Sequence, residues 1–297
     1  MEAIVGRDVG RNIGALVQEA RNGLLGAARS IARHPEPTVA VMTGVFIPWA
    51  EPPAAETDGP IGSAELAVGL TAAGWSARVV TDEQCADAVR ASLEAAGTGV
   101  DIPLDVVPVS AGARDAVGSL ISRYQDDVGV THMVAVERLG PGRDGRVYDM
   151  SGRDVSTVTA PLDELFSAAN WTRIGIGDGG NELGMGTLPA KIVAANVDLG
   201  ERIHCVVPCD HLIVSGTSNW GAQALLAAIA VLRKERAGTL LERFTPEGNS
   251  AILRDTVAKG PAVDGVTQTR ENSVDGLPAE DHARMIQEIL KVVEDLD

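Results

Sequence analysis

An alternation of apolar runs and helical segments between residues 38 and 138 restricts the fold of this chain more than any other feature. The runs are near-continuous and rich in valine, as buried strands of a parallel sheet are. They lie at 38–48, 76–82, 103–109 and 131–138, and helical segments at 63–73, 83–96 and 113–124 separate them. The pattern predicts a doubly wound, mostly parallel sheet with helices on both faces, a three-layer α/β/α fold.

The rest of the chain continues this pattern less regularly. We expect helices at 8–34, 161–170, 220–235 and 278–296, and strands at 171–176, near 202–208 and at 211–216. The 297 residues contain no repeat, low-complexity run or clear linker. The sequence therefore predicts one α/β domain over 1–297 with a short N-terminal helical arm, about 1–34.

Charge and composition restrict the partners and the compartment. A formal charge of −16 disfavours nucleic acid and anionic membranes as partners. The most apolar stretch, 220–232, is too short to cross a bilayer, so we expect it in the core or at the interface of a homo-oligomer. Three cysteines imply no disulfide framework, and the N-terminus resembles no signal peptide, so we expect a cytoplasmic protein.

The loops at the carboxyl ends of the strands are the expected ligand site. They follow the strands that contain Thr43, Asp82 and Glu137. The first continues into ETDGPIG at 56–62, where Glu56 and Asp58 flank a turn. The alternative interpretation of that pair is an Asx-turn that leads into the next helix.

The segment RIGIGDGGNELGMG, residues 173–186, holds six glycines, and we consider three interpretations. The spacing of Gly175, Gly177 and Gly180 matches a dinucleotide fingerprint, but Asp178 stands where bare N–H groups would be needed. The glycines could instead form a backbone nest that binds an anion, with Asp178 and Glu182 as acceptors for an ammonium. The third interpretation is a structural turn.

His204, Cys205, Cys209 and His211 are spaced poorly for zinc, because adjacent residues of a strand face opposite sides. We expect the cysteines to be buried. His211 opens a strand and is a candidate general acid, although a structural role would also suit it.

Seven segments together resemble the D-glutamate cyclase family. They are TGVFIP at 43–48, ETDGPIG at 56–62, VER at 136–138, DGRVYDMSG at 144–152, GIGDGGNELGMG at 175–186, DHLIVSG at 210–216 and SNWG at 218–221. The resemblance runs from about residue 8 to the tail. It implies a hydro-lyase that converts D-glutamate to 5-oxo-D-proline and water.

That chemistry needs a base for the amine and stabilisation of the charge that develops on the attacked carboxyl group. The candidate catalytic residues are Asp58, Glu137, Asp178, Glu182 and His211. The candidate substrate-binding residues are Thr43, Gly44, Glu56, Arg138, Gly179, Gly180, Asn181, Ser218 and Asn219. Among these, Arg138 is expected either to clamp the substrate's α-carboxylate or to pair with a neighbouring acid.

A divalent cation is a candidate cofactor. Asp58, Asp178 and Glu182 offer the hard oxygen ligands that Mg²⁺, Mn²⁺ and Ca²⁺ prefer. Two other functions stay open beside the cyclase: a related enzyme or binding protein for another small amino or hydroxy acid, and a nucleotide-dependent enzyme that uses residues 175–180.

Overall fold

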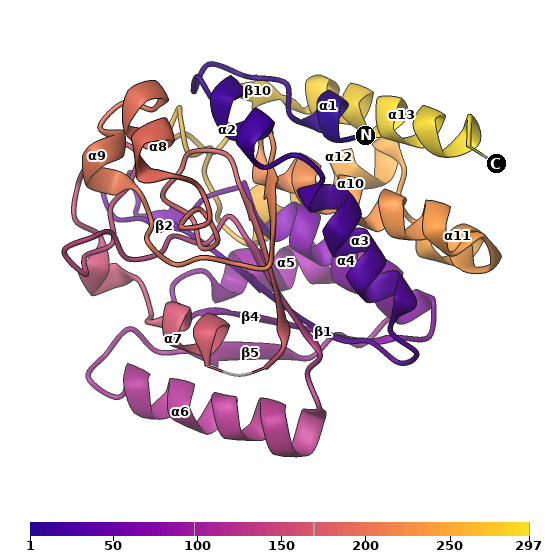
Figure 1. Ribbon diagram of the computed structural model, residues 1–297, viewed down its shortest axis with the longest axis horizontal. Coiled ribbons are helices and arrows are strands. Elements are labelled where there is room, and N and C mark those ends of the chain that lie inside the picture. Colours follow the sequence, from indigo (N-terminus) through magenta and orange to yellow (C-terminus); the bar gives the residue numbers. More distant parts are fainter. Residues whose placement is uncertain (98, 169, 297) are drawn as a thin grey trace.

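A six-stranded parallel sheet forms the centre of the protein in the computed structural model, which describes residues 1–97, 99–168 and 170–296 (Figure 1). Its order is β5-β4-β1-β6-β7-β8, and every neighbouring pair is parallel. The strands are β1 (Thr38–Thr43), β4 (Ser76–Asp82), β5 (Leu104–Val107), β6 (His132–Val136), β7 (Thr172–Gly177) and β8 (His211–Val214). The doubly wound α/β fold predicted from the sequence is confirmed.

The winding of the chain reverses between β1 and β6. From β1 the chain proceeds outward through β4 to β5, returns to β6 on the other side of β1, and continues through β7 to β8. In such sheets, two strands flank the reversal, and the chain leaves them toward opposite faces of the sheet. A crevice therefore opens at the carboxyl ends of these two strands. The order therefore places a ligand site beyond Thr43 and Val136.

Alternate residues of the strands enter two apolar cores, as the two-residue period of a strand requires. In β1, Val39 and Val41 pack on one face, whereas Ala40 and Met42 pack on the other. The first face is covered by α3 (Gly23–Arg33), α4 (Pro60–Ala72), α5 (Ala86–Ala96) and α10 (Ser218–Leu232). The second is covered by α2 (Gly14–Glu19), α6 (Ala113–Arg123), α7 (Leu162–Ser167) and α8 (Ala190–Asn196).

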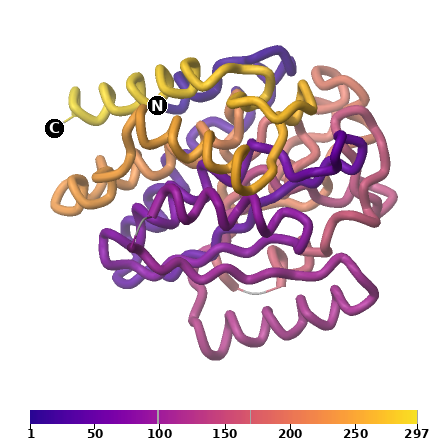
Figure 2. The backbone as a smooth tube through the Cα atoms, turned by 180° about the vertical axis from the view of Figure 1, so that it is seen from behind, coloured from indigo at the N-terminus to yellow at the C-terminus, as the bar shows by residue number. Residues whose placement is uncertain are grey.

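Two C-terminal helices add an outer layer to the first face. Helix α12 (Pro246–Lys259) packs on α5, and α13 (Ala279–Glu294) packs on α10 and α12. The short α1 (Glu2–Val5) contacts α13, so both ends of the chain lie at the same end of the molecule (Figure 2). The remaining elements are α9 (Gly200–Ile203), α11 (Lys234–Leu240), a π-helix (Tyr124–Val128), a 3-10 helix (Ser156–Val158) and the short pairs β2 (Phe46–Ile47) with β3 (Ala54–Ala55) and β9 (Ser273–Val274) with β10 (Leu277–Pro278).

Several sequence-based boundaries were wrong. The expected helix 8–34 is broken at Asn22, whose left-handed φ of 68° separates α2 from α3. The strand 38–48 ends at Thr43, because Gly44 turns the chain with a φ of 113°. The strand near 202–208 is absent: its first residues belong to α9, and 204–208 run without regular structure.

Elsewhere the differences are smaller. Helix 161–170 is shorter, as α7, and residue 169 lies outside the described residues. The helix expected at 220–235 begins at Ser218 and ends at Leu232, before α11. Helix α12 was not anticipated. Among the helices of the described residues, none is both long and apolar enough to cross a membrane.

Candidate active site

A cavity of about 290 Å³ opens at the point where the winding of the sheet reverses. Segments that follow β1, β6 and β7 line it, together with the N-terminal segment and residues 265–268 near the C-terminus. The acidic residues on its wall are Glu56, Glu137, Asp149 and Asp178, and its apolar lining consists of Val45, Phe46, Ile47, Trp49, Leu139, Met150, Val155 and Val266. Of the three loops expected at the site, those after β1 and β6 line the cavity, whereas the loop after β4 contributes no residue to its wall.

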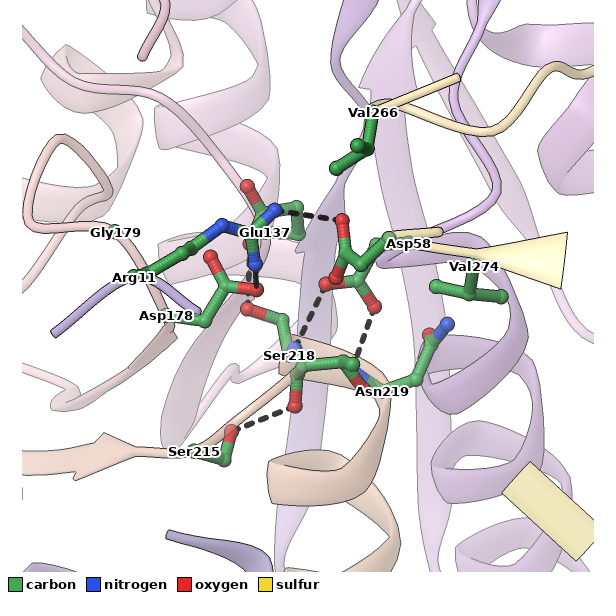
Figure 3. Close-up of polar contacts among 12 residues, drawn as sticks. Arg11, Asp58, Glu137, Asp178, Gly179, Ser215, Ser218, Asn219, Val266 and Val274 are labelled. Carbon is green, nitrogen blue, oxygen red and sulfur yellow. Dashed lines mark hydrogen bonds and ion pairs between the residues drawn. The ribbon is translucent and has the colours of Figure 1, made fainter. Parts of the chain in front are cut away.

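Two helices that begin beside the cavity exchange their N-terminal caps. Asp58, just before α4, accepts hydrogen bonds from the Ser218 and Asn219 N–H groups at the start of α10, at 2.7 and 2.8 Å (Figure 3). In return, Asn219 Oδ1 accepts from the N–H groups of Gly59 and Gly62 at the start of α4, at 3.0 and 2.7 Å. Because the first N–H groups of a helix lack partners within the helix, this exchange fixes α4 and α10 relative to each other.

The exchange changes the roles expected for two residues. The Asn219 side chain also donates to the Thr57 carbonyl at 3.1 Å, so both ends of its amide are bound within the protein. We therefore assign Asn219 to capping rather than to the substrate. Ser218 Oγ donates to Glu137 Oε2 at 2.5 Å, which positions a carboxyl group of the cavity wall.

The glycine-rich loop does form a nest, but its anion comes from the chain itself. Glu182 Oε1 accepts from the N–H groups of Asp178 and Gly179 at 2.8 and 2.6 Å, and Oε2 accepts from that of Gly180 at 2.7 Å. The nest predicted for a substrate carboxylate is therefore occupied by the Glu182 carboxylate, which stabilises the conformation of the loop. Asn181 donates its side-chain N–H to the Tyr148 carbonyl at 2.8 Å and still lines the cavity.

Arg11 enters the cavity wall from the N-terminal segment, and the sequence analysis missed it. Its guanidinium pairs with Asp178 and, at 2.7 Å, with Asp275 Oδ1 (Figure 3). Its side chain is 18% exposed, against 2% and 3% for the two carboxylates. A lone arginine far from every motif gives no local signal, and neither does an Asp-Gly pair such as Asp275-Gly276.

Burial and mutual repulsion perturb the carboxyl groups. Burial is the largest cause that raises the pKa of Glu137 well above its usual value, and Glu182, Glu56 and Asp58 add to it. Burial, then Asp275 and Asp58, raises the pKa of Glu56 in the same way. The pKa of Asp178 is also raised by burial, although Arg11 opposes the shift. A raised pKa moves the proton exchange of a carboxyl group away from acidic pH, which is the direction that acid–base catalysis near neutral pH requires.

Arg138 is buried and bound within the protein. It is 1% exposed and absent from the cavity wall, and it pairs with Asp82 at 2.7 Å. Its other N–H groups donate to the carbonyl oxygens of Gly44 and Ala160, at 2.8 and 2.7 Å. The salt-bridge alternative is therefore correct for Arg138, and it leaves Gly44 with a structural role.

His211 lies away from the cavity. It is the first residue of β8, whereas the site lies beyond the last, Val214. A strand rises about 3.3 Å per residue, so His211 lies roughly 10 Å from the carboxyl edge of the sheet, where the cavity opens. Thr43 lies at that edge but is fully buried against Gly59, where a Cβ would come within 2.5 Å of its hydroxyl. Neither residue lines the cavity.

Among the residues that the structure describes, two groups of three carboxylates have oxygens close enough to share a cation. They are Asp58, Asp178 and Asp275, and Glu137, Asp178 and Glu182. The expected trio is thus divided, with Asp178 in both groups. Arg11 already supplies a positive charge to Asp178 and Asp275, and backbone N–H groups satisfy Asp58 and Glu182. A divalent cation stays a prediction.

The remaining motifs have structural explanations. Gly175 and Gly177 lie within β7, and residues 178–189 separate that strand from α8, so the strand–turn–helix of a dinucleotide site is not formed. A Cβ on Gly175 would lie 2.5 Å from the Leu183 carbonyl oxygen, which shows why the folded-back loop needs glycine there. The three cysteines are buried and form no disulfide, as expected.

Fold and site together define a doubly wound α/β protein with a small-molecule cavity over a buried carboxylate cluster. Comparison with known proteins identifies the family: residues 1–290 match the model of the D-glutamate cyclase-like, C-terminal family, and the chain belongs to it. It is 30% identical to the human protein D-glutamate cyclase, mitochondrial, over an alignment of 319 residues. The alignment covers 98% of this chain and 51% of that relative, so the chain spans about half of the relative's length.

Proposed function

We propose that this chain is a hydro-lyase that converts D-glutamate to 5-oxo-D-proline and water. The observation that carries the proposal is the presence of two buried carboxyl groups with raised pKa values, Glu56 and Glu137, on the wall of one small cavity. The family membership and the name of the human relative support the choice of substrate.

The charges of the cavity suit an amino dicarboxylic acid. Glu56, Glu137 and Asp178 form an acidic side that attracts the substrate ammonium. Arg153 is also on the cavity wall, with its guanidinium 3.8 Å from the centre of the Trp49 ring and its Nε bound to Asp149 at 3.0 Å. An arginine held in this way can bind a carboxylate through two parallel hydrogen bonds, so we assign it to a substrate carboxylate.

The reaction moves two protons from nitrogen to oxygen. The ammonium must lose one proton before the amine attacks the γ-carboxyl carbon, and the new amide nitrogen loses a second. A C–N bond forms, a C–O bond breaks, and one carboxyl oxygen leaves as water. We assign the base to Glu137, whose carboxyl group Ser218 orients, and the proton donor to Glu56, whose pKa is raised so that it can hold a proton.

A time course followed by NMR tests the proposal. Purified protein is incubated with D-glutamate or L-glutamate, each with and without EDTA, and 5-oxoproline is measured. We expect product from the D-isomer. Loss of product with EDTA would support a divalent cation at the carboxylate groups, and full activity would exclude a removable one. No product from either isomer would refute the proposal, and stabilisation by D-glutamate without turnover would favour a binding protein.

Variants test the assigned roles. Glu137→Gln should lower turnover about 100-fold or more while D-glutamate still raises the melting temperature. Glu65→Gln is the matched control, because Glu65 is also a buried glutamate, but it binds Gln223 and Asn249 between α4, α10 and α12. Equal rates for the wild type and Glu137→Gln would remove Glu137 from the mechanism.

A further inference from the structure

Arg11 belongs to a segment that is fixed to the site at both ends. Before it, the Val5 carbonyl accepts a hydrogen bond from the Gly216 N–H at 2.7 Å, in the loop between β8 and α10. After it, Ile13 is fully buried in the core beneath the glycine-rich loop. Between them, Asp8 Oδ1 accepts from the N–H groups of Gly10 and Arg11, both at 2.9 Å. The segment therefore presents Arg11 in one place.

The two carboxylates that Arg11 binds come from distant parts of the chain. Asp178 follows β7, whereas Asp275 lies in the turn between β9 and β10 with a φ of 56°. Asp264 holds that turn by accepting from the Gly276 N–H at 2.8 Å and also from the Val266 N–H at 2.8 Å. Because Val266 lines the cavity, the same C-terminal segment that supplies Asp275 also forms part of the cavity wall.

Without a nearby positive charge, the carboxylates of Asp58, Asp178 and Asp275 would repel one another. The oxygens of Asp58, Asp178 and Asp275 lie within 4.8 Å of one another, and Asp275 Oδ2 is buried with no hydrogen-bond partner among the described residues. Arg11 and Arg153 are the arginines on the cavity wall, and only Arg11 contacts this group. Its charge also lowers the pKa values of Glu56 and Asp58, against the effect of burial.

We infer that Arg11 is a positioning residue of the site: its guanidinium joins the β7 loop to the 264–278 segment and holds the neighbouring carboxyl groups in the positions that the reaction needs. Arg11 thus connects the N-terminal segment, the glycine-rich loop and the C-terminal segment into one cavity wall. The catalytic part of this inference rests on the proposed function. The structural part does not, and it can be measured separately.

Variants at two arginines of the same segment test the inference. Arg11→Ala removes the guanidinium, and Arg11→Lys keeps a charge but cannot bind both carboxylates in the same way. Arg7→Ala is the matched control, because Arg7 pairs with Glu288 at the surface, where their side chains are 56% and 42% exposed. We expect Arg11→Ala to lower turnover of D-glutamate about 100-fold, the size typical of a misplaced site, and Arg7→Ala to stay within about twofold.

Two readouts separate positioning from a general loss of stability. In Arg11→Ala, the acidic limb of the pH–rate profile should move to higher pH, because the base loses a nearby positive charge. Added guanidinium chloride at concentrations far below denaturing should restore part of the activity of Arg11→Ala and none in Arg7→Ala. An unshifted profile without rescue would overturn the catalytic part.

Hydrogen exchange tests the structural part even if D-glutamate is not a substrate. In Arg11→Ala, amides of both 175–186 and 264–278 should exchange faster than in the wild type, whereas in Arg7→Ala they should not. Unchanged exchange in both segments would overturn the structural part. An inactive wild type with faster exchange in Arg11→Ala would refute the proposed function and support the connection made by Arg11.

Discussion

Replacing Asn219 with alanine distinguishes a capping residue from a substrate-binding residue. The variant removes the acceptor for the N–H groups of Gly59 and Gly62 and the donor to the Thr57 carbonyl. The Gly59 N–H keeps a second acceptor in Asp58 at 3.1 Å, so two buried groups are left without a partner. At about 1–3 kcal/mol each, the unfolding free energy should fall by about 2–6 kcal/mol, a large part of the 5–15 kcal/mol typical of a domain.

Urea denaturation followed by circular dichroism measures this loss. The midpoint should fall while the m-value stays constant, because the surface exposed on unfolding is unchanged. Asn196→Ala is the control: its side chain donates one hydrogen bond of 2.8 Å to the Ile192 carbonyl within α8, so the loss should be about 1 kcal/mol. A normal midpoint combined with a raised KM for D-glutamate would refute the capping role.

Three further perturbations test the remaining assignments. Burial raises the pKa of Glu65 from its usual 4.5 to about 7. Between these two pH values the folded state keeps a proton on Glu65 that the unfolded state has released. Stability should therefore fall by about 3 kcal/mol from this group as pH rises from about 4.5 to 7, and urea titrations of Glu65→Gln should lack that part of the loss. Gly216→Ala would place a Cβ 2.3 Å from the Arg7 carbonyl oxygen and should lower both melting temperature and turnover, whereas Gly14→Ala, with no neighbour within 4 Å, should change neither. His211→Gln should leave kcat within about threefold, because His211 is the first residue of β8 and the cavity lies at the opposite end of that strand. Loss of one limb of the pH–rate profile in this variant would contradict the prediction.

The position of the site was predictable, because sheet topology determines it. Apolar runs that alternate with helices predict parallel strands, and the carboxyl ends of such strands meet at one edge. Glu56, Glu137 and Asp178 were expected there, and they do line the cavity. Their roles as base, donor or ligand remain predictions, since each depends on the substrate.

The sequence did not show which of the candidate side chains are already bound within the protein. Arg138 has the charge to bind a carboxylate, but nothing near it in the sequence shows that Asp82 already binds it. Glu182 looked like a ligand, although it lies close enough to turn back on its own loop and fill the nest. In both cases a local motif identified a suitable group without showing whether that group was free.

By itself, the sequence predicted the approximate positions of the strands of the central sheet, the doubly wound class of the fold and the edge at which the cavity opens. These follow from hydrophobic periodicity and turn residues, which are local properties. Only the tertiary structure decided which charges face one another: Arg11 lies 167 residues from Asp178 and 264 from Asp275, yet binds both. Electrostatic energy depends on distance in space and on burial, and neither can be read from position along the chain.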